Sequence, residues 1–161
     1  MYDNHSIKLG SNVKIGYIPQ EITFEKDVTI YEYARKYSTL EESYLRSALF
    51  KFMFTHDDVY KKISSLSGGE KVRLKLFCLM QEDINFLILD EPTNNIDINT
   101  REILENTLSV YKGTILFISH DRYFINKLAK KIISIENKKL VEYPGNYDDY
   151  KKQSNNMIKY N

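Results

Sequence analysis

The chain has 161 residues, of which 42% are hydrophobic and 28% charged, and this composition supports one folded core with a solvated surface. It excludes an intrinsically disordered chain and collagen-like repeats. The 23 Lys and Arg residues nearly balance the 22 Asp and Glu residues, so binding to nucleic acid would need a local basic patch. The single cysteine, Cys78, excludes an internal disulfide and favours a reducing, cytoplasmic location. With no signal-peptide pattern and no apolar run near the roughly 18 residues of a spanning helix, we expect neither export nor membrane insertion.

The first part of the chain predicts a strand followed by a helical layer. Val13 to Ile18 alternates between exposed and buried character, which is typical of a half-exposed strand. Thr29 to Phe54 lacks Gly and Pro and is helical in character. The side chains that can line one face of this helical segment are Tyr44, Leu45, Ala48, Leu49, Phe52 and Met53.

Two apolar runs, Phe86–Asp90 and Thr114–Ile118, predict the strands of a parallel core. Neither run alternates, which is typical of strands buried on both faces. Between them we expect a helix with Asn99 as its N-cap and Glu102 reaching back to it. A strand, a helix and a second strand in this order predict a right-handed parallel crossover.

The last part of the chain predicts a β-hairpin and a polar tail. Lys131–Glu136 and Leu140–Tyr143 flank residues 137–139, which predicts a hairpin at the edge of the sheet. Residues 148–161 are polar, with scattered Lys and Tyr, and their pattern leaves their order open. Lysines recur along this part, and they fit either an RNA-facing patch or an ordinary solvated surface. They are Lys127, Lys130, Lys131, Lys138, Lys139, Lys151 and Lys152.

A turn with two glycines opens a long segment whose apolar residues recur at helical spacing. Ser67, Gly68 and Gly69 would leave backbone N–H groups exposed at the positive end of a helix, which is a site for a phosphate group. The same residues also fit a plain serine N-cap with a flexible entry turn. The sequence leaves both interpretations open.

Polar side chains follow the two core strands. Asp90 and Glu91 end the first strand and His120 follows the second, so we expect all three at the carboxyl edge of the sheet, where α/β proteins bind ligands. One carboxylate can hold Mg²⁺, the other can polarise an attacking water, and the histidine can touch a terminal phosphate. The alternatives are an exposed acidic turn before Pro92 and a histidine that only packs or caps.

Two further polar residues have open interpretations. Gln20 follows the first expected strand, and its amide oxygen can reach a metal ion or the attacking water; it also fits an ordinary polar loop. Asp97 fits a helix-capping carboxylate or a contact across a dimer interface, and its spacing from Glu91 does not choose between them.

Taken in order, these elements resemble the Q-loop, signature, Walker B, D-loop and H-switch of an ATP-binding-cassette nucleotide-binding domain: Gln20, Leu66–Glu70, Phe86–Glu91, Asp97 and His120. Residues 90–94, 119–124 and 145–150 are similar to the ABC-F proteins, soluble twin-cassette ATPases that act on ribosomes as translation factors or antibiotic-resistance proteins. The resemblance implies an α/β fold with a P-loop NTPase-like parallel sheet, a small helical subdomain and a C-terminal β-hairpin.

The resemblance implies that ATP and Mg²⁺ are the cofactors. Glu91 would be the catalytic base and His120 the sensor of the γ-phosphate. Asp90 would hold Mg²⁺, and Gln20 would contact the metal ion or the lytic water.

The resemblance also implies a second cassette, paired head to tail. Ser67, Gly68 and Gly69 would bind the nucleotide on that cassette, with Asp97 at the interface. Asn95 and its neighbour Ile96 depart from the His and Leu that are usual in the D-loop of the family.

No Gly-x-x-x-x-Gly-Lys-Ser/Thr motif occurs in the chain, and this motif is the phosphate-binding loop of the class. We therefore expect a partial cassette that lacks the phosphate-loop strand, hydrolyses ATP poorly by itself and exposes apolar strand faces near Leu89 and Phe117. Residues 19–83 would carry the Q-loop, helical subdomain and signature helix, and residues 84–147 the Walker B, D-loop and H-switch core. Residues 148–161 would be a polar tail.

Three functions fit this sequence. The first is a part of a ribosome-associated ABC-F ATPase; the short interval between Gln20 and Ser67 shows no long insertion and resembles a second cassette. The second is the nucleotide-binding subunit of a membrane transporter, which needs a groove for a coupling helix near Gln20. The third is a catalytically silent interaction fragment.

Overall fold

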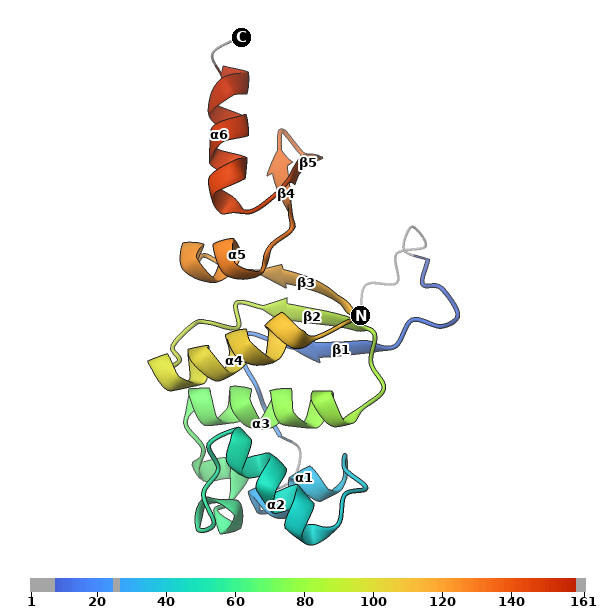
Figure 1. The fold of residues 1–161 in the computed structure, drawn as a ribbon, viewed down its shortest axis with the longest axis vertical. Helices are drawn as coiled ribbons and strands as arrows, with labels where there is room; N and C mark the ends of the chain where they lie inside the picture. The colour runs from blue at the N-terminus through green and yellow to red at the C-terminus, as the bar shows by residue number, and fades with distance from the viewer. Residues whose placement is uncertain (1–7, 25–26, 159–161) are drawn as a thin grey trace.

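The computed structural model describes residues 8–24 and 27–158, with side chains up to residue 154, as an α/β fold around a three-stranded parallel sheet (Figure 1). Strands β1 (Ile15–Ile18), β2 (Phe86–Asp90) and β3 (Thr114–Ile118) lie side by side in that order. The register pairs Ile18 with Leu89 and Leu89 with Phe117. All three carboxyl ends therefore open at the same edge of the sheet.

Three helices pack on one face of this sheet: α3 (Gly68–Gln81), α4 (Ile98–Val110) and α5 (Arg122–Leu128). Their apolar side chains and those of the strands form one buried cluster, in which burial is favourable by about 2 kcal/mol per large side chain. The fully or almost fully buried members of this cluster are Ile18, Leu76, Leu79, Leu87, Leu89, Leu104, Leu108 and Phe124. The predicted strands and their parallel crossover are confirmed.

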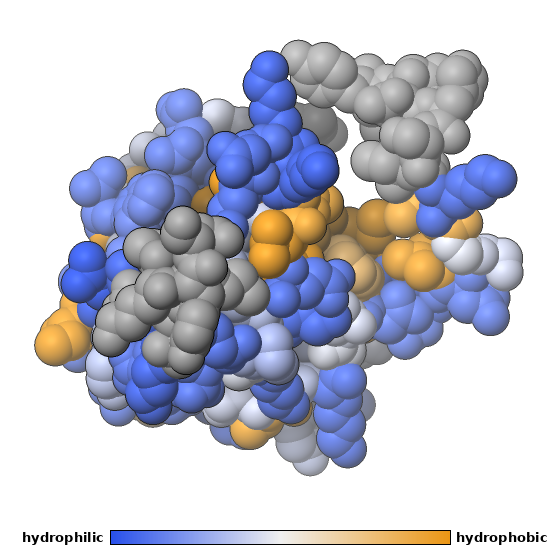
Figure 2. Space-filling model, turned by 90° about the horizontal axis from the view of Figure 1, so that it is seen from above, coloured by the Kyte–Doolittle hydropathy of each residue, from blue (hydrophilic) through white to orange (hydrophobic). Residues whose placement is uncertain are grey.

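The opposite face of the sheet is left exposed by the described residues. Its exposed apolar side chains are Ile15, Tyr17, Leu116 and Ile118. The expected exposure of apolar strand residues near Phe117 is present at Leu116 and Ile118, whereas Leu89 and Phe117 themselves point to the helix-covered face, where Phe117 meets Phe124 with ring centroids 5.2 Å apart. The strands alternate in burial and are not buried on both faces. Figure 2, viewed from the hairpin end of the molecule, shows apolar patches between polar side chains.

The expected helical layer is present but consists of two helices, α1 (Ile30–Arg35) and α2 (Glu42–Lys51), and two short 3₁₀ turns, η1 (Asp58–Tyr60) and η2 (Ile63–Ser65). Leu45 and Leu49 are buried as predicted. Tyr44 and Met53 are exposed, against expectation. Met53 lies beyond the end of α2, where its backbone is left-handed (φ 59°). The second core cluster lies between this layer and α3.

The C-terminal part consists of β4 (Lys131–Glu136), β5 (Lys139–Pro144) and α6 (Tyr147–Ile158). The hairpin is confirmed, and its turn residues Asn137 and Lys138 take the left-handed backbone that two-residue hairpin turns favour. It forms its own antiparallel sheet, however, and does not join the edge of the parallel sheet. Most of the polar tail is helix α6, which packs on the hairpin through Tyr150 and Tyr143, with ring centroids 4.9 Å apart.

Among the residues that the structure describes, no helix is both long and apolar enough to cross a bilayer.

The thiol of Cys78 is buried in the core between α3 and the helical layer, and this burial raises its pKa to about 12. We predict that Ellman's reagent does not modify Cys78 at pH 8 in the native chain and modifies it fully in denaturant. The contribution of the buried thiol to stability is complete below its ordinary pKa of 9.0 and is lost as the pH rises toward 12. If the reagent modified Cys78 in the native chain as fast as in denaturant, the burial of this side of α3 would be contradicted.

Candidate functional site

The carboxyl ends of β1, β2 and β3 and the N-termini of α3 and α4 lie on the same side of the molecule (Figure 1). This arrangement follows from the topology, because each helix runs antiparallel to the strands that it connects. All the site residues expected from the sequence lie on or next to these ends.

Glu91 and His120 are in direct contact at this edge. Oε1 of Glu91 lies 3.2 Å from Nε2 of His120, and Oε2 accepts the backbone N–H of His120 at 3.3 Å. The Glu91 side chain is 9% exposed, whereas the His120 side chain is 93% exposed. The site therefore joins a held, largely buried carboxylate to an imidazole that faces solvent.

The backbone at Glu91 explains how this carboxylate reaches His120. Its N–H still donates to the carbonyl of Ile118 at 2.9 Å, so the pairing of β2 with β3 continues one residue beyond Asp90. Its φ of 47° is left-handed, which for a glutamate costs on the order of 1 kcal/mol. The chain then turns, and the Glu91 carbonyl accepts the N–H of Asn94 at 3.1 Å.

Two hydroxyl groups that the sequence analysis did not single out support this contact. The Oγ1 of Thr93 and the Oγ of Ser119 lie 3.2 Å apart, and Ser119 Oγ also accepts the N–H of Asp121 at 3.1 Å. They tie the turn that carries Glu91 to the turn that carries His120. Their positions in the sequence could have indicated this role, because Thr93 lies two residues after Glu91 and Ser119 directly precedes His120.

Asp90 and Gln20 lie at the same edge. Asp90 is half-buried at the end of β2, and Gln20 is exposed just beyond β1. Within the described ranges, no group of three or more His, Cys, Asp or Glu side chains could hold a metal ion. Mg²⁺ that accompanies a nucleotide commonly takes only one or two protein carboxylates, with phosphate and water as its other ligands. Asp90 fits that pattern, and a metal site made of protein ligands alone does not.

The signature turn is a capped helix start. Ser67 Oγ accepts the N–H of Glu70 at 3.3 Å, and Glu70 Oε2 accepts the N–H of Ser67 at 2.8 Å, a reciprocal capping box. Ser67 and Gly68 are exposed. The amides of Gly68 and Gly69, as the first two helical residues, have no partner within the helix. The cap and an anion-binding role are thus compatible here.

Asp97 caps α4, which is the first of its two open interpretations. Its Oδ1 accepts the N–H of Thr100 at 2.9 Å and its Oδ2 accepts the Thr100 hydroxyl at 2.6 Å. The Thr100 hydroxyl, and after it the Thr100 N–H, lowers the pKa of Asp97. The expectation that Asn99 is the N-cap was wrong by two positions, because Asp97 has the extended backbone that the cap requires.

Gly69 joins the signature turn to the start of α4. A Cβ at this position would lie 2.8 Å from Asp97 Oδ2 and 3.0 Å from Thr100 Oγ1, so only glycine allows the two helices to approach this closely. Gly69 and Asp97, far apart in the sequence, are therefore neighbours within one chain.

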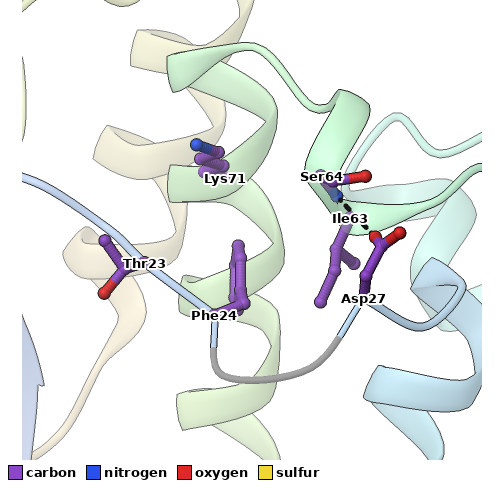
Figure 3. A pocket seen from close by; sticks show the side chains of 6 residues that line it. All are labelled: Thr23, Phe24, Asp27, Ile63, Ser64 and Lys71. Atoms are coloured by element: carbon purple, nitrogen blue, oxygen red, sulfur yellow. Dashed lines mark hydrogen bonds between the residues drawn. The ribbon is translucent and has the colours of Figure 1, made fainter.

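A pocket of about 240 Å³ lies between the segment after β1, α3 and η2 (Figure 3). Its lining contains none of the expected site residues. Asp27 in this pocket accepts the N–H of Ser64 at 3.2 Å, and hydrogen bonds from Ser64 lower the pKa of Asp27. These contacts make the pocket part of the junction between α3 and the helical layer.

Comparison with known proteins identifies the class. Residues 2–94, more than half of the chain, match the ABC transporter family, and the chain therefore belongs to the ATP-binding-cassette family. Its relatives are members of the F branch, as the resemblance implied. It is 46% identical over 159 residues to the ATP-binding protein YdiF of Bacillus subtilis, covering 97% of this chain and 25% of that protein. It is 40% identical over 104 residues to ABC transporter F family member 2 of Arabidopsis thaliana, covering 65% of this chain and 15% of that protein.

The chain thus spans about a quarter of the length of YdiF. Among solved structures, the RNase-L Inhibitor superposes with a TM-score of 0.71 at 22% identity, covering 94% of this chain and 31% of that one. This likeness confirms the expected fold class.

The close approach at Gly69 generates a prediction with a matched control one residue away. We expect Gly69→Ala to destabilise the chain by about 1–3 kcal/mol, because the new Cβ displaces Asp97 from its cap. Gly68→Ala meets only the Asn95 carbonyl at 3.9 Å and should be neutral or stabilising by up to about 1 kcal/mol. Urea unfolding measures both, and equal effects would show that the contact at Gly69 is unimportant.

Proposed function

We propose that this chain forms the hydrolytic side of an ATP site in an ABC-F type ATPase, with the phosphate-binding loop supplied by polypeptide outside these 161 residues. The observation that carries the proposal is the contact between Glu91 and His120 at the carboxyl edge of the sheet. A general base needs a carboxylate in a defined orientation, and a phosphate sensor needs a donor that can reach solvent; this pair supplies both.

In this proposal Glu91 accepts a proton from the attacking water. His120, through its exposed imidazole, exchanges its contact with Glu91 for one with the γ-phosphate. Bound Mg²⁺ would be held by Asp90 and would neutralise charge on the phosphates. Gln20, exposed at the same edge, would orient the metal ion or the water. The chain's own share of the chemistry is thus a base, a sensor and one metal ligand.

The signature turn serves a second nucleotide in this proposal. Ser67 and Gly68 are exposed at the positive end of α3, a helix of 14 residues, and the amides of Gly68 and Gly69 can bind a γ-phosphate on an opposing cassette. Asp97 lies beside Gly69 and would reach the same interface. The signature turn, within residues 19–83, would then act toward the partner cassette, and Glu91 and His120, within residues 84–147, toward the chain's own nucleotide.

The place of the phosphate-loop strand is suggested by the sheet itself. In the described part of the chain β3 pairs only with β2, and the hairpin forms a separate sheet. A strand supplied from elsewhere can pair with the outer edge of β3, and the helix after it can cover Leu116 and Ile118. Such a partner would remove the exposed apolar surface.

The resemblance of residues 90–94, 119–124 and 145–150 to ABC-F proteins is the ground for proposing a ribosome-associated, cytoplasmic role, with ribosomal RNA as a contact. Fewer than seven of the lysines named in the sequence analysis are available to bind RNA, because three of them contact carboxylates. Lys127 pairs with Glu105, Lys131 with Glu142 and Lys152 with Asp149. Of these seven lysines, the four that make no ion pair with a described residue are Lys130, Lys138, Lys139 and Lys151. Lys138 in the hairpin turn and Lys139 at the start of β5 are the best placed for RNA phosphates.

We predict that the chain alone hydrolyses ATP at background rate and gains activity when mixed with a polypeptide that carries an ABC phosphate-binding loop. Glu91→Gln should reduce the restored rate by about 100-fold or more, because the base is lost. Glu102→Gln, an exposed carboxylate on α4, is the matched control and should leave the rate unchanged. Phosphate release measures the rate. Robust hydrolysis by the chain alone, or hydrolysis that Glu91→Gln does not affect, would contradict the proposal.

We predict that the chain sediments with ribosomes and that the double change Lys138→Glu and Lys139→Glu weakens this binding, more strongly at low salt, because it reverses charge next to RNA phosphate. Lys127→Gln is the control and should leave ribosome binding unchanged, because Lys127 is already paired with Glu105. Capture by a membrane protein in place of ribosomes would favour a transporter subunit.

A further inference from the structure

Two ion pairs join α4 to α5. Nη1 of Arg101 lies 3.0 Å from Oδ2 of Asp121, and Nζ of Lys127 lies 2.7 Å from Oε2 of Glu105. Arg101 and Glu105 are one helical turn apart and share a face of α4. These pairs therefore connect the helix that begins after Asp97 to the helix that begins after His120.

The two oxygens of the Asp121 carboxylate make different contacts. Oδ1 accepts the N–H groups of Tyr123 and Phe124, at 3.0 and 3.1 Å, and so caps α5. Oδ2 faces Arg101, is buried, and accepts no hydrogen bond among the described residues. Among the described residues, Arg101 is thus the cation that balances the negative charge on Oδ2. Without Arg101, this buried oxygen would have no neighbouring cation.

The turn that carries His120 is held at three successive residues. Ser119 contacts Thr93, His120 contacts Glu91, and Asp121 contacts Arg101. The first two contacts come from the loop after β2, and the third comes from α4. Since the His120 side chain is 93% exposed, the backbone of this turn sets the direction of the imidazole.

We propose that Arg101 is a positioning residue that, by holding Asp121, keeps the His120 imidazole on Glu91. The backbone N–H of Arg101 donates to the carbonyl of Asp97 at 3.0 Å, so one hydrogen-bonded helical turn separates Arg101 from the cap. The Arg101–Asp121 pair thus links the first turn of α4 to the turn that carries His120. The catalytic consequence rests on the proposed function; the positioning itself does not.

The test is native-state amide hydrogen exchange on the 161-residue chain, followed by NMR without nucleotide. The reporter is the His120 amide, which donates to Glu91, and the reference is the Leu89 amide in the central strand. We expect Arg101→Met, which keeps an aliphatic stem, to speed exchange at His120 about three- to fivefold without changing Leu89. Asp121→Asn, which keeps the helix cap but removes the charge, should have the same effect.

Three further variants separate positioning from a merely structural role. Arg101→Lys keeps a cation and should restore part of the protection at His120. In the double variant Arg101→Met with Asp121→Asn, the His120 amide should exchange no faster than in either single variant, because each substitution removes the same ion pair. Glu105→Gln is the matched control at the other ion pair and should leave the His120 amide unchanged.

Unchanged exchange at His120 in both single variants would overturn the proposal, as would an equal acceleration at His120 and Leu89, which would indicate general destabilisation. None of these measurements uses ATP. If Glu91→Gln had no effect on hydrolysis while Arg101→Met released His120, the positioning would stand and the catalytic assignment would fail.

Discussion

The parallel pairing of β2 with β3 is the constraint on which the site depends. Asp90 lies beside Ile118, and one more backbone hydrogen bond, from Glu91 to Ile118, extends the pairing to the residue that carries the base. The side chains that follow each strand then meet, with Glu91 3.2 Å from the His120 ring. A shift of the register by one residue would turn every side chain of β3 to the other face and separate the pair.

A second set of contacts joins the helices to the same frame. Gly69 allows α3 to touch the start of α4, and the Arg101–Asp121 pair ties α4 to α5. The signature turn, the Asp97 cap and the His120 turn are therefore parts of one connected unit. Among the described residues the helices occupy one face of the sheet, and apolar side chains of the other face, such as Leu116 and Ile118, are exposed.

The sequence predicts the structure correctly where residues close together in the chain decide it. The strands, the hairpin and the helix that begins at Ser67 all follow from short-range patterns, and the reciprocal cap of Ser67 and Glu70 is a contact between residues three apart. The errors arose where burial depends on distant partners. Tyr44 and Met53 have helical spacing but are exposed. The apolar strand residues have similar character on both faces, although helices of the described chain cover one face.

The sequence by itself determined the order of the motifs, the α/β class and the placement of Asp90, Glu91 and His120 at strand ends, because these depend on periodicity and on the direction of parallel strands. Only the tertiary structure decided that Glu91 and His120 touch, that Gly69 adjoins Asp97, and that Arg101 pairs with Asp121. Each of these contacts joins segments separated by 20 or more residues, and their geometry is set by the register of the sheet and the approach of the helices, which no local pattern encodes.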